Sequence, residues 1–279
     1  MNGKNRKKTI LVTGCSSGIG AYCARALKAE GWHVIASART EDGLSVLRND
    51  GIEAYRLDYA EPDSIAAFFD QAMKATGGYC DALFNNGGYG QVGAVEDLPS
   101  EALRAQFDAN FFGWHDLTKR VIPVMRAQGH GRIVQCSSIL GLVPMRFRGA
   151  YNASKHALEG LSVTLAMELE GSGIHVSLIE PGAIVSKFRT NALALFHRHI
   201  DIEHSVHRQD YQAQLRRLER QGAANIGLGP EAVHEVLRHA LTARRPRYHY
   251  AVTRAAKMGV IARRLLPARL FYRWLANQD

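Results

Sequence analysis

The sequence predicts an α/β protein with a single doubly wound domain, in which helices cover both faces of a parallel sheet. Short apolar, β-branched runs alternate with segments of helical periodicity, and a glycine-rich turn joins the first run to the first helix. The 279 residues are 46% apolar and 22% charged, which is typical of globular proteins and excludes the disordered and fibrous classes. Because the chain shows no internal repeat or linker, we expect residues 1–279 to form one domain.

The alternation of strands and helices runs from the N-terminus past the middle of the chain. The expected strands are Thr9–Thr13, His33–Ser37, Ala54–Leu57, Ala82–Asn85, Arg132–Ser137 and His175–Glu180. The expected helices are Ile19–Glu30, Leu44–Asn49, Pro62–Ala75, Ser100–Gln128 and Tyr151–Glu170. Pro62 and Pro99 mark helix starts, and Gly129 and Gly171 mark helix ends. Such alternation predicts a parallel sheet whose ligands bind at the carboxyl ends of the strands.

The stretch of residues 186–226 interrupts this alternation. It is polar and rich in His and Arg, with a helix expected at Gln209–Gln221. An insertion at this point of such a fold often forms a lid over the substrate, and we expect that role here. Its histidines are spaced poorly for zinc, so we expect solvated side chains and no metal site. They are His197, His199, His204 and His207.

The C-terminal extension, residues 244–279, carries much of the formal net charge of +9. No acidic residue occurs between Glu235 and Asp279, and arginines alternate there with large apolar residues. Two interpretations remain open: a basic amphipathic helix on an acidic membrane surface, or a segment that packs on the domain and covers the substrate pocket. A nucleic-acid partner is not expected, because the chain lacks a binding motif and an aromatic stacking platform.

Cysteine usage and the N-terminal residues bear on the compartment. Four cysteines lie far apart and predict reduced, mostly buried thiols rather than disulfides or a zinc site. They are Cys15, Cys23, Cys80 and Cys136. Residues Met1–Lys8 lack a signal-peptide core, and no apolar run is long enough to span a bilayer. We therefore expect a cytoplasmic protein, peripheral at a membrane surface if the extension binds lipid.

The glycine-rich turn after the first expected strand is the strongest local motif. Glycines let the backbone approach a ligand closely, and N–H groups at the start of a helix attract a phosphate. The spacing Gly-x-x-x-Gly-x-Gly differs from the common Gly-x-Gly-x-x-Gly fingerprint. We expect this turn to bind cofactor phosphates through Thr13, Gly14, Ser16, Ser17, Gly18, Ile19 and Gly20.

A tyrosine and a lysine at the start of a later helix carry the expected chemistry. Tyr151 and Lys155 are four residues apart and therefore share a helix face. An ammonium near a phenol favours the phenolate and lowers the tyrosine pKa, so the pair can move a proton on or off an alcohol oxygen. Further polar motifs lie near expected strand ends or within a helix. They are Ser138, Asn85-Asn86-Gly87-Gly88, Pro181-Gly182 and Asn110.

With these motifs in this order, the sequence from about Lys8 to about Ser186 resembles the short-chain dehydrogenase/reductase family. A weaker likeness points to its steroid and retinol dehydrogenase branch. The resemblance implies a Rossmann domain that binds NAD or NADP. It implies that Ser138 binds the substrate oxygen, that Tyr151 is the acid/base, and that Lys155 tunes Tyr151 and holds the nicotinamide ribose. It also implies that Asn110 anchors a water in the proton relay.

The resemblance implies further cofactor contacts. Asp58 would contact the adenine, and Asn85, Asn86 and Gly87 would line the cofactor site. The nicotinamide would be covered by Pro181, Gly182, Ile184 and Ser186. The chain departs from the family pattern in two mild ways. Gly87-Gly88 stands where Ala-Gly is usual, and Ser186 stands where threonine is usual, with the hydroxyl retained.

The end of the second expected strand bears on which nicotinamide cofactor is used. An acid there would bind the ribose 2′-hydroxyl and repel a 2′-phosphate. Ala38 occupies the expected acid position, and Arg39 follows it. A guanidinium suits a phosphate, and the Ser37 hydroxyl would add a hydrogen bond. The sequence therefore favours NADP(H), with NAD(H) as the alternative.

The residues expected around the substrate are largely apolar, which favours a hydrophobic alcohol or carbonyl compound. They are Leu140, Val143, Phe147, Val185 and Phe188. The sequence thus predicts an NADP(H)-dependent oxidoreductase. The alternative is a catalytically weak dinucleotide-binding sensor or interaction protein on the same fold. The joint presence of Asn110, Ser138, Tyr151 and Lys155 favours the enzyme. We also expect a homodimer or tetramer, built on the two long helices.

Overall fold

The computed structural model describes residues 6–223 and 227–276. Within that part of the chain, seven strands form one parallel sheet in the order β3-β2-β1-β4-β5-β6-β7. The strands are β1 Thr9–Val12, β2 His33–Ala38, β3 Glu53–Arg56, β4 Ala82–Asn85, β5 Gly131–Cys136, β6 Ile174–Glu180 and β7 His249–Ala251. The predicted single Rossmann-type domain is therefore confirmed. Strand order reverses at β1, where ligands of such sheets bind.

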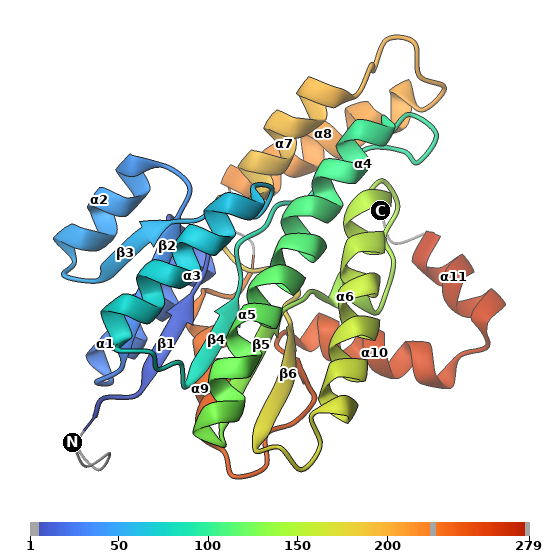
Figure 1. Cartoon of the computed structure of the whole chain (residues 1–279). Coiled ribbons are helices and arrows are strands. Elements are labelled where there is room, and N and C mark those ends of the chain that lie inside the picture. The colour runs from blue at the N-terminus through green and yellow to red at the C-terminus, as the bar shows by residue number, and fades with distance from the viewer. Residues whose placement is uncertain (1–5, 224–226, 277–279) are drawn as a thin grey trace.

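Helices cover both faces of this sheet. Those of the Rossmann core are α1 Gly18–Ala29, α2 Glu41–Asn49, α3 Pro62–Thr76, α4 Ser100–Phe107, α5 Gly113–Gln128, α6 Gly149–Glu168 and α9 Glu231–Thr242. Helices α3, α5 and α6 lie on one face, and α1 packs beside α9 on the other (Figure 1). The sequence had assigned no ranges to α9 and β7.

The predicted single helix Ser100–Gln128 is wrong at one point. A π-helical turn, Asp108–Phe112, separates α4 from α5. Such a turn accommodates an extra residue and rotates the following side chains relative to a regular α-helix. Asn110 lies in this turn with its side chain fully buried.

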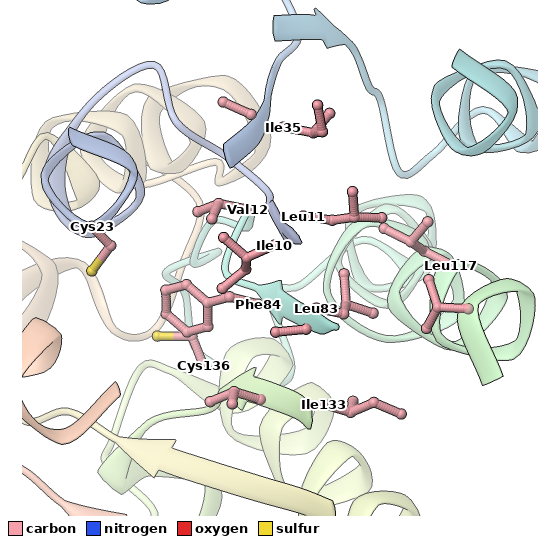
Figure 2. Close-up of a cluster of buried hydrophobic side chains, with 14 of the residues drawn as sticks. Ile10, Leu11, Val12, Cys23, Ile35, Leu83, Phe84, Leu117, Ile133 and Cys136 are labelled. Atoms are coloured by element: carbon pink, nitrogen blue, oxygen red, sulfur yellow. The ribbon is translucent and has the colours of Figure 1, made fainter. Parts of the chain in front are cut away.

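The main core lies between the central strands and their covering helices. Side chains alternate across β1: Leu11 points toward Leu117 of α5, whereas Ile10 and Val12 point to the opposite face, where Cys23 of α1 lies (Figure 2). This period of two is what a strand buried on both faces requires. All four cysteines are buried and unpaired, as expected.

Two helical additions extend this core. Helices α7 Phe188–His199 and α8 Arg208–Ala223 lie together at the top of Figure 1, and α10 Arg254–Leu265 and α11 Ala268–Ala276 lie at its right. A second, smaller apolar cluster holds α7 and α8 against the loop after β4. Its buried members are Val92, Ala94, Phe147, Ala192, Phe196, Ile200 and Tyr211. Among the described helices, none combines the length and apolarity that crossing a bilayer requires.

Candidate active site

The glycine-rich turn packs against the ends of neighbouring segments. Gly14 and Gly18 have φ values of 67° and 58°, which favour glycine. A Cβ on Gly14 would lie 2.3 Å from Gly87 Cα, and one on Gly18 would lie 2.9 Å from Ser186 Cβ. Ser17 caps α1 without a side-chain hydrogen bond, which leaves the first-turn N–H groups for an anion.

Thr13 ties this turn to the end of β4. Its hydroxyl donates to the Phe84 carbonyl at 3.3 Å and accepts from the backbone N–H groups of Asn86 at 2.8 Å and Gly87 at 3.2 Å. The Tyr59 hydroxyl lies 2.9 Å from the same oxygen. Since Thr13 is fully buried, its hydroxyl holds the backbone of Asn86 and Gly87 rather than facing a ligand.

The two asparagines at the end of β4, Asn85 and Asn86, point in different directions. Asn85 is fully buried, and its amide bonds Tyr59, Thr118 and Gln135 at 2.6–3.0 Å. The Asn85 side chain therefore packs in the interior next to the site and does not line its surface. Asn86 donates to the Thr13 carbonyl at 3.0 Å and so crosses to the glycine-rich turn.

The end of β2 presents one cation. Arg39 is exposed, and none of the hydrogen bonds or ion pairs found in residues 6–223 and 227–276 engages its guanidinium. Burial raises the pKa of Tyr89, and the charge of Arg39 opposes this shift whereas that of Asp58 adds to it, so both charges act on that phenol. Ser37 is buried, and its hydroxyl accepts from Gly14 N–H at 3.4 Å. Ser37 thus acts on the loop rather than offering an exposed hydroxyl to a phosphate.

Ser138, Tyr151 and Lys155 converge beyond the end of β5. Ser138 hydrogen bonds the Tyr151 side chain and caps the short 3-10 turn Ile139–Gly141. The Lys155 ammonium lies 5.8 Å from the Tyr151 ring centroid and donates to the Cys136 carbonyl at 2.9 Å. All three residues are buried. A serine, a phenol and an ammonium from two elements therefore meet at one point.

Burial dominates the protonation of this trio. It raises the pKa of Tyr151 well above its ordinary value, while the Ser138 hydrogen bond acts in the opposite direction. The expected net lowering of that pKa by Lys155 is therefore not observed. Burial also lowers the pKa of Lys155 to about 8. The phenol is consequently protonated at neutral pH.

Asn110, which the sequence singled out, and Trp114 both touch the site. Asn110 donates to the Tyr89 carbonyl at 2.8 Å and accepts from Tyr89 N–H at 3.1 Å, which fixes the loop after β4. Trp114, which sequence reasoning missed, lies under Lys155 with the ammonium 4.0 Å from its ring centroid. Its indole N–H also donates to the Gly87 carbonyl at 2.7 Å. An aromatic face stabilises the charged lysine.

The segment after β6 closes over this point. Pro181 accepts from Ile139 N–H at 3.0 Å, and a Cβ on Gly182 would lie 2.2 Å from Thr253 Oγ1. Ile184 packs on the main core, and Ser186 accepts from Phe188 N–H at 3.3 Å. The Phe188 ring stacks edge-on against Tyr151 with centroids 5.4 Å apart.

The remaining residues expected around the substrate divide into two groups. Leu140 and Val185 are partly buried near Ser138 and the closing segment, and buried Val143 faces α10. Phe147 lies elsewhere: it is buried in the second cluster, edge-on to Tyr211 at 5.6 Å. The sequence placed it by proximity to Ser138, but its positive φ of 58° turns the chain toward the lid.

Charged groups behind Lys155 also escaped sequence reasoning. Glu159, one helical turn after Lys155, and Glu180 are buried beside His249, whose Nδ1 lies 2.7 Å from Glu180 Oε1. Burial raises the pKa of Glu159 to about 7, and the charge of Glu159 raises the Lys155 pKa against the effect of burial. The sequence could have indicated Glu159, because its four-residue spacing from Lys155 puts both side chains on one face of the helix.

The lid histidines with resolved contacts have separate partners. His204 Nδ1 lies 2.8 Å from Asp201, and His207 Nε2 lies 2.6 Å from Glu96. His199 Nδ1 lies 2.8 Å from the Gln91 side-chain oxygen. The contacts of His199 and His207 join this segment to the loop after β4, whereas the contact of His204 lies within the segment.

The family model for short chain dehydrogenases matches residues 8–194. This chain belongs to that family. The short-chain dehydrogenase is 39% identical over 271 residues to the oxidoreductase YbbO of Escherichia coli K12, a match covering 97% of this chain and 94% of the relative. It is also 38% identical over 197 residues to human retinol dehydrogenase 8, covering 67% of this chain and 62% of that protein.

Solved structures of the same family share the fold. A Burkholderia phymatum short-chain dehydrogenase/reductase in complex with NAD has a TM-score of 0.80 at 26% identity, covering 92% of this chain and 93% of that one. An actinorhodin polyketide ketoreductase with NADPH has a TM-score of 0.72 at 28% identity, covering 88% and 95%. Both nicotinamide dinucleotides therefore occur among the structural relatives.

Proposed function

We propose that this short-chain dehydrogenase transfers a hydride between NADP(H) and a small hydrophobic alcohol or carbonyl compound, with Tyr151 as the acid/base. The observation that carries the proposal is the convergence of Ser138, Tyr151 and Lys155 at the carboxyl end of the sheet. A sensor built on the same fold has no need of a buried serine–phenol hydrogen bond beside an ammonium.

The protein's own groups account for the proton. The Ser138 and Tyr151 hydroxyls offer two donors to one substrate oxygen. In the reducing direction, Tyr151 donates its proton to that oxygen, and its raised pKa keeps it protonated until then. Lys155, charged below about pH 8, stabilises the phenolate that remains. In the oxidising direction, Tyr151 first loses its proton, and the phenolate then takes the proton from the alcohol.

The residues present fit a dinucleotide. The uncapped N-terminus of α1 and the close approach of Gly14 to Gly87 suit a pyrophosphate. Asp58, Asn86 and Gly87 would flank the adenosine half, and Lys155 would hold the nicotinamide ribose. When bound, the nicotinamide supplies or accepts the hydride, and the protein orients it.

The unpaired guanidinium of Arg39 supports NADP(H) over NAD(H). A charge-assisted bond to a 2′-phosphate contributes about 1.5–3 kcal/mol, or roughly a ten- to hundredfold preference. We expect Arg39→Ala to lower the NADPH-to-NADH ratio of kcat/KM by that factor. Arg56→Ala is the matched control, because Arg56 pairs with Ala38 across the sheet and is engaged by Glu61 at 2.7 Å. An unchanged ratio in Arg39→Ala would exclude this role.

Apolar residues around the closing segment support a hydrophobic substrate. Phe188 covers Tyr151, and a Cβ on Gly90 would lie 2.8 Å from the Phe188 ring. The lid helices α7 and α8 are held down by their own cluster. The direct test measures NADPH consumption with short and long aliphatic aldehydes, aromatic ketones, steroids and retinoids. A preference for polar sugars, or no turnover at all, would refute the assignment.

We also propose a homodimer or tetramer through the faces of α5 and α6. Phe112, at the π-helical turn, and Met167, on α6, expose 55% and 63% of their surfaces. Large exposed apolar side chains on such helices are typical of subunit interfaces. Light scattering should give at least twice the mass of one chain, and Met167→Glu should reduce it. A wild-type monomer would contradict the proposal.

A further inference from the structure

The terminal helices α10 and α11 have one face on the domain and another without a partner. On the inner face of α10, Ala256 and Gly259 are buried. A Cβ on Gly259 would lie 3.5 Å from Val143, and Arg263 donates to the Leu142 carbonyl. Helix α10 therefore packs on the domain, against the loop after Ser138.

The opposite face of α10 is apolar and exposed. Met258, Ile261 and Leu265 are spaced by three and four residues, so they form one stripe roughly opposite to Gly259. They are 68%, 55% and 77% exposed. On α11, Leu270 and Trp274 are 56% and 43% exposed, whereas Phe271 is buried. A run of large apolar side chains in water indicates a surface made for contact.

The charge of these two helices indicates which kind of partner would bind this exposed face. The helices carry six exposed basic residues and no acid between residues 254 and 276. These are Arg254, Lys257, Arg263, Arg264, Arg269 and Arg273. A second copy of the same face would oppose like charges, which disfavours self-association. An anionic lipid surface complements the charge and accepts the apolar side chains.

We propose that the apolar stripe and basic residues of α10 and α11 dock this protein on an anionic bilayer surface, lying in the interface without crossing it. The docking itself rests only on these two helices. A consequence that depends on the proposed function is that the loop after Ser138, which the inner face of α10 touches, is held near the bilayer with α10 between the loop and the lipid.

The test uses the full chain without cofactor or substrate, so its outcome is independent of activity. Flotation with phosphatidylcholine vesicles, with and without phosphatidylglycerol, should show binding only when the anionic lipid is present. Each basic residue near an anionic surface contributes roughly a fivefold gain in partition. Arg269→Gln with Arg273→Gln should therefore weaken binding by about twenty-fivefold. Equal binding to both vesicle types would overturn the electrostatic part of the proposal.

Matched substitutions test the apolar stripe. Ile261→Glu on α10 should reduce vesicle binding by at least about tenfold, because an apolar contact is replaced by a charge that the lipid repels. Val46→Glu on α2 is the control: Val46 is 51% exposed, against 55% for Ile261. If both variants bind like the wild type, the stripe is not the docking face.

Trp274 provides a direct readout of insertion. The other two tryptophans lie away from α10 and α11: Trp114 is fully buried, and Trp32, just before β2, packs partly buried against the main core. An emission shift to shorter wavelength on adding anionic vesicles should therefore come largely from Trp274 and vanish in Trp274→Phe. Light scattering supplies the competing outcome. A wild-type oligomer that Ile261→Glu dissociates, without any vesicle binding, would show that a second copy covers the face and would overturn the proposal.

Discussion

Replacing Thr13 by valine should loosen the backbone of Asn86 and Gly87, although the buried Thr13 side chain itself faces no ligand. Valine keeps the shape of threonine and removes only the hydroxyl. Two backbone groups then lose their partner, the N–H groups of Asn86 and Gly87, whereas the Tyr59 hydroxyl keeps its hydrogen bond to Asn85. At about 1 kcal/mol for each part-buried group, we expect a loss of about 2 kcal/mol in the free energy of unfolding.

Urea denaturation followed by tryptophan fluorescence measures this loss, because Trp114 packs 6.1 Å from the Tyr59 ring. The Kd for NADPH should rise in the same variant, since the Asn86–Gly87 backbone is no longer held. Thr13→Ser is the conservative control, which keeps the hydroxyl and loses about 1 kcal/mol of methyl burial. Thr164→Val, at an exposed hydroxyl on α6, should change stability by less than about 0.5 kcal/mol. A Thr13→Val protein as stable as Thr13→Ser would refute the reasoning.

Three further outcomes follow from the structure. The rate of carbonyl reduction should fall as pH rises through about 8, because Lys155 loses its charge there. A rate that stays unchanged up to pH 10 would contradict this. Phe188→Ala should raise KM for a hydrophobic substrate roughly tenfold with little change in NADPH affinity, because the ring over Tyr151 is lost; an unchanged KM would exclude that contact. Asp81, whose pKa is held at about 2 by Arg6 and His130, should contribute about 2 kcal/mol of stability above pH 4 that is lost as pH falls toward 2. Asp81→Asn should remove both this contribution and its acid dependence in urea denaturation.

The order of elements could be predicted because each strand and helix carries a local signal. Apolar runs of β-branched residues located six strands to within a residue or two, and the chain's glycines and prolines marked helix ends. The interruption at Asp108–Phe112 has no such signal, since its residues are compatible with a regular helix. The turn contains the buried Asn110, whose partner, the Tyr89 backbone in the loop after β4, is distant in the sequence.

Within the site, the motifs identified many of the residues that belong to it, but they did not reveal which atoms those residues contact. Asn85 and Thr13 were expected beside the cofactor, but their side chains form hydrogen bonds in a buried network that includes Tyr59 and Gln135. The direction of the Tyr151 pKa shift also depends on burial, which spacing alone does not reveal. Phe147 shows the limit of adjacency along the chain, because one residue with positive φ directs it into the lid cluster.

The central claim is that Tyr151 exchanges the proton with the substrate oxygen. The most direct measurement compares wild type and Tyr151→Phe, using NADPH and the carbonyl compound that turns over fastest, with NADPH binding followed separately by fluorescence. Loss of the acid should lower kcat by about 10²- to 10⁴-fold while the Kd for NADPH stays within about twofold. A kcat within tenfold of wild type would contradict the assignment of Tyr151 as the acid/base.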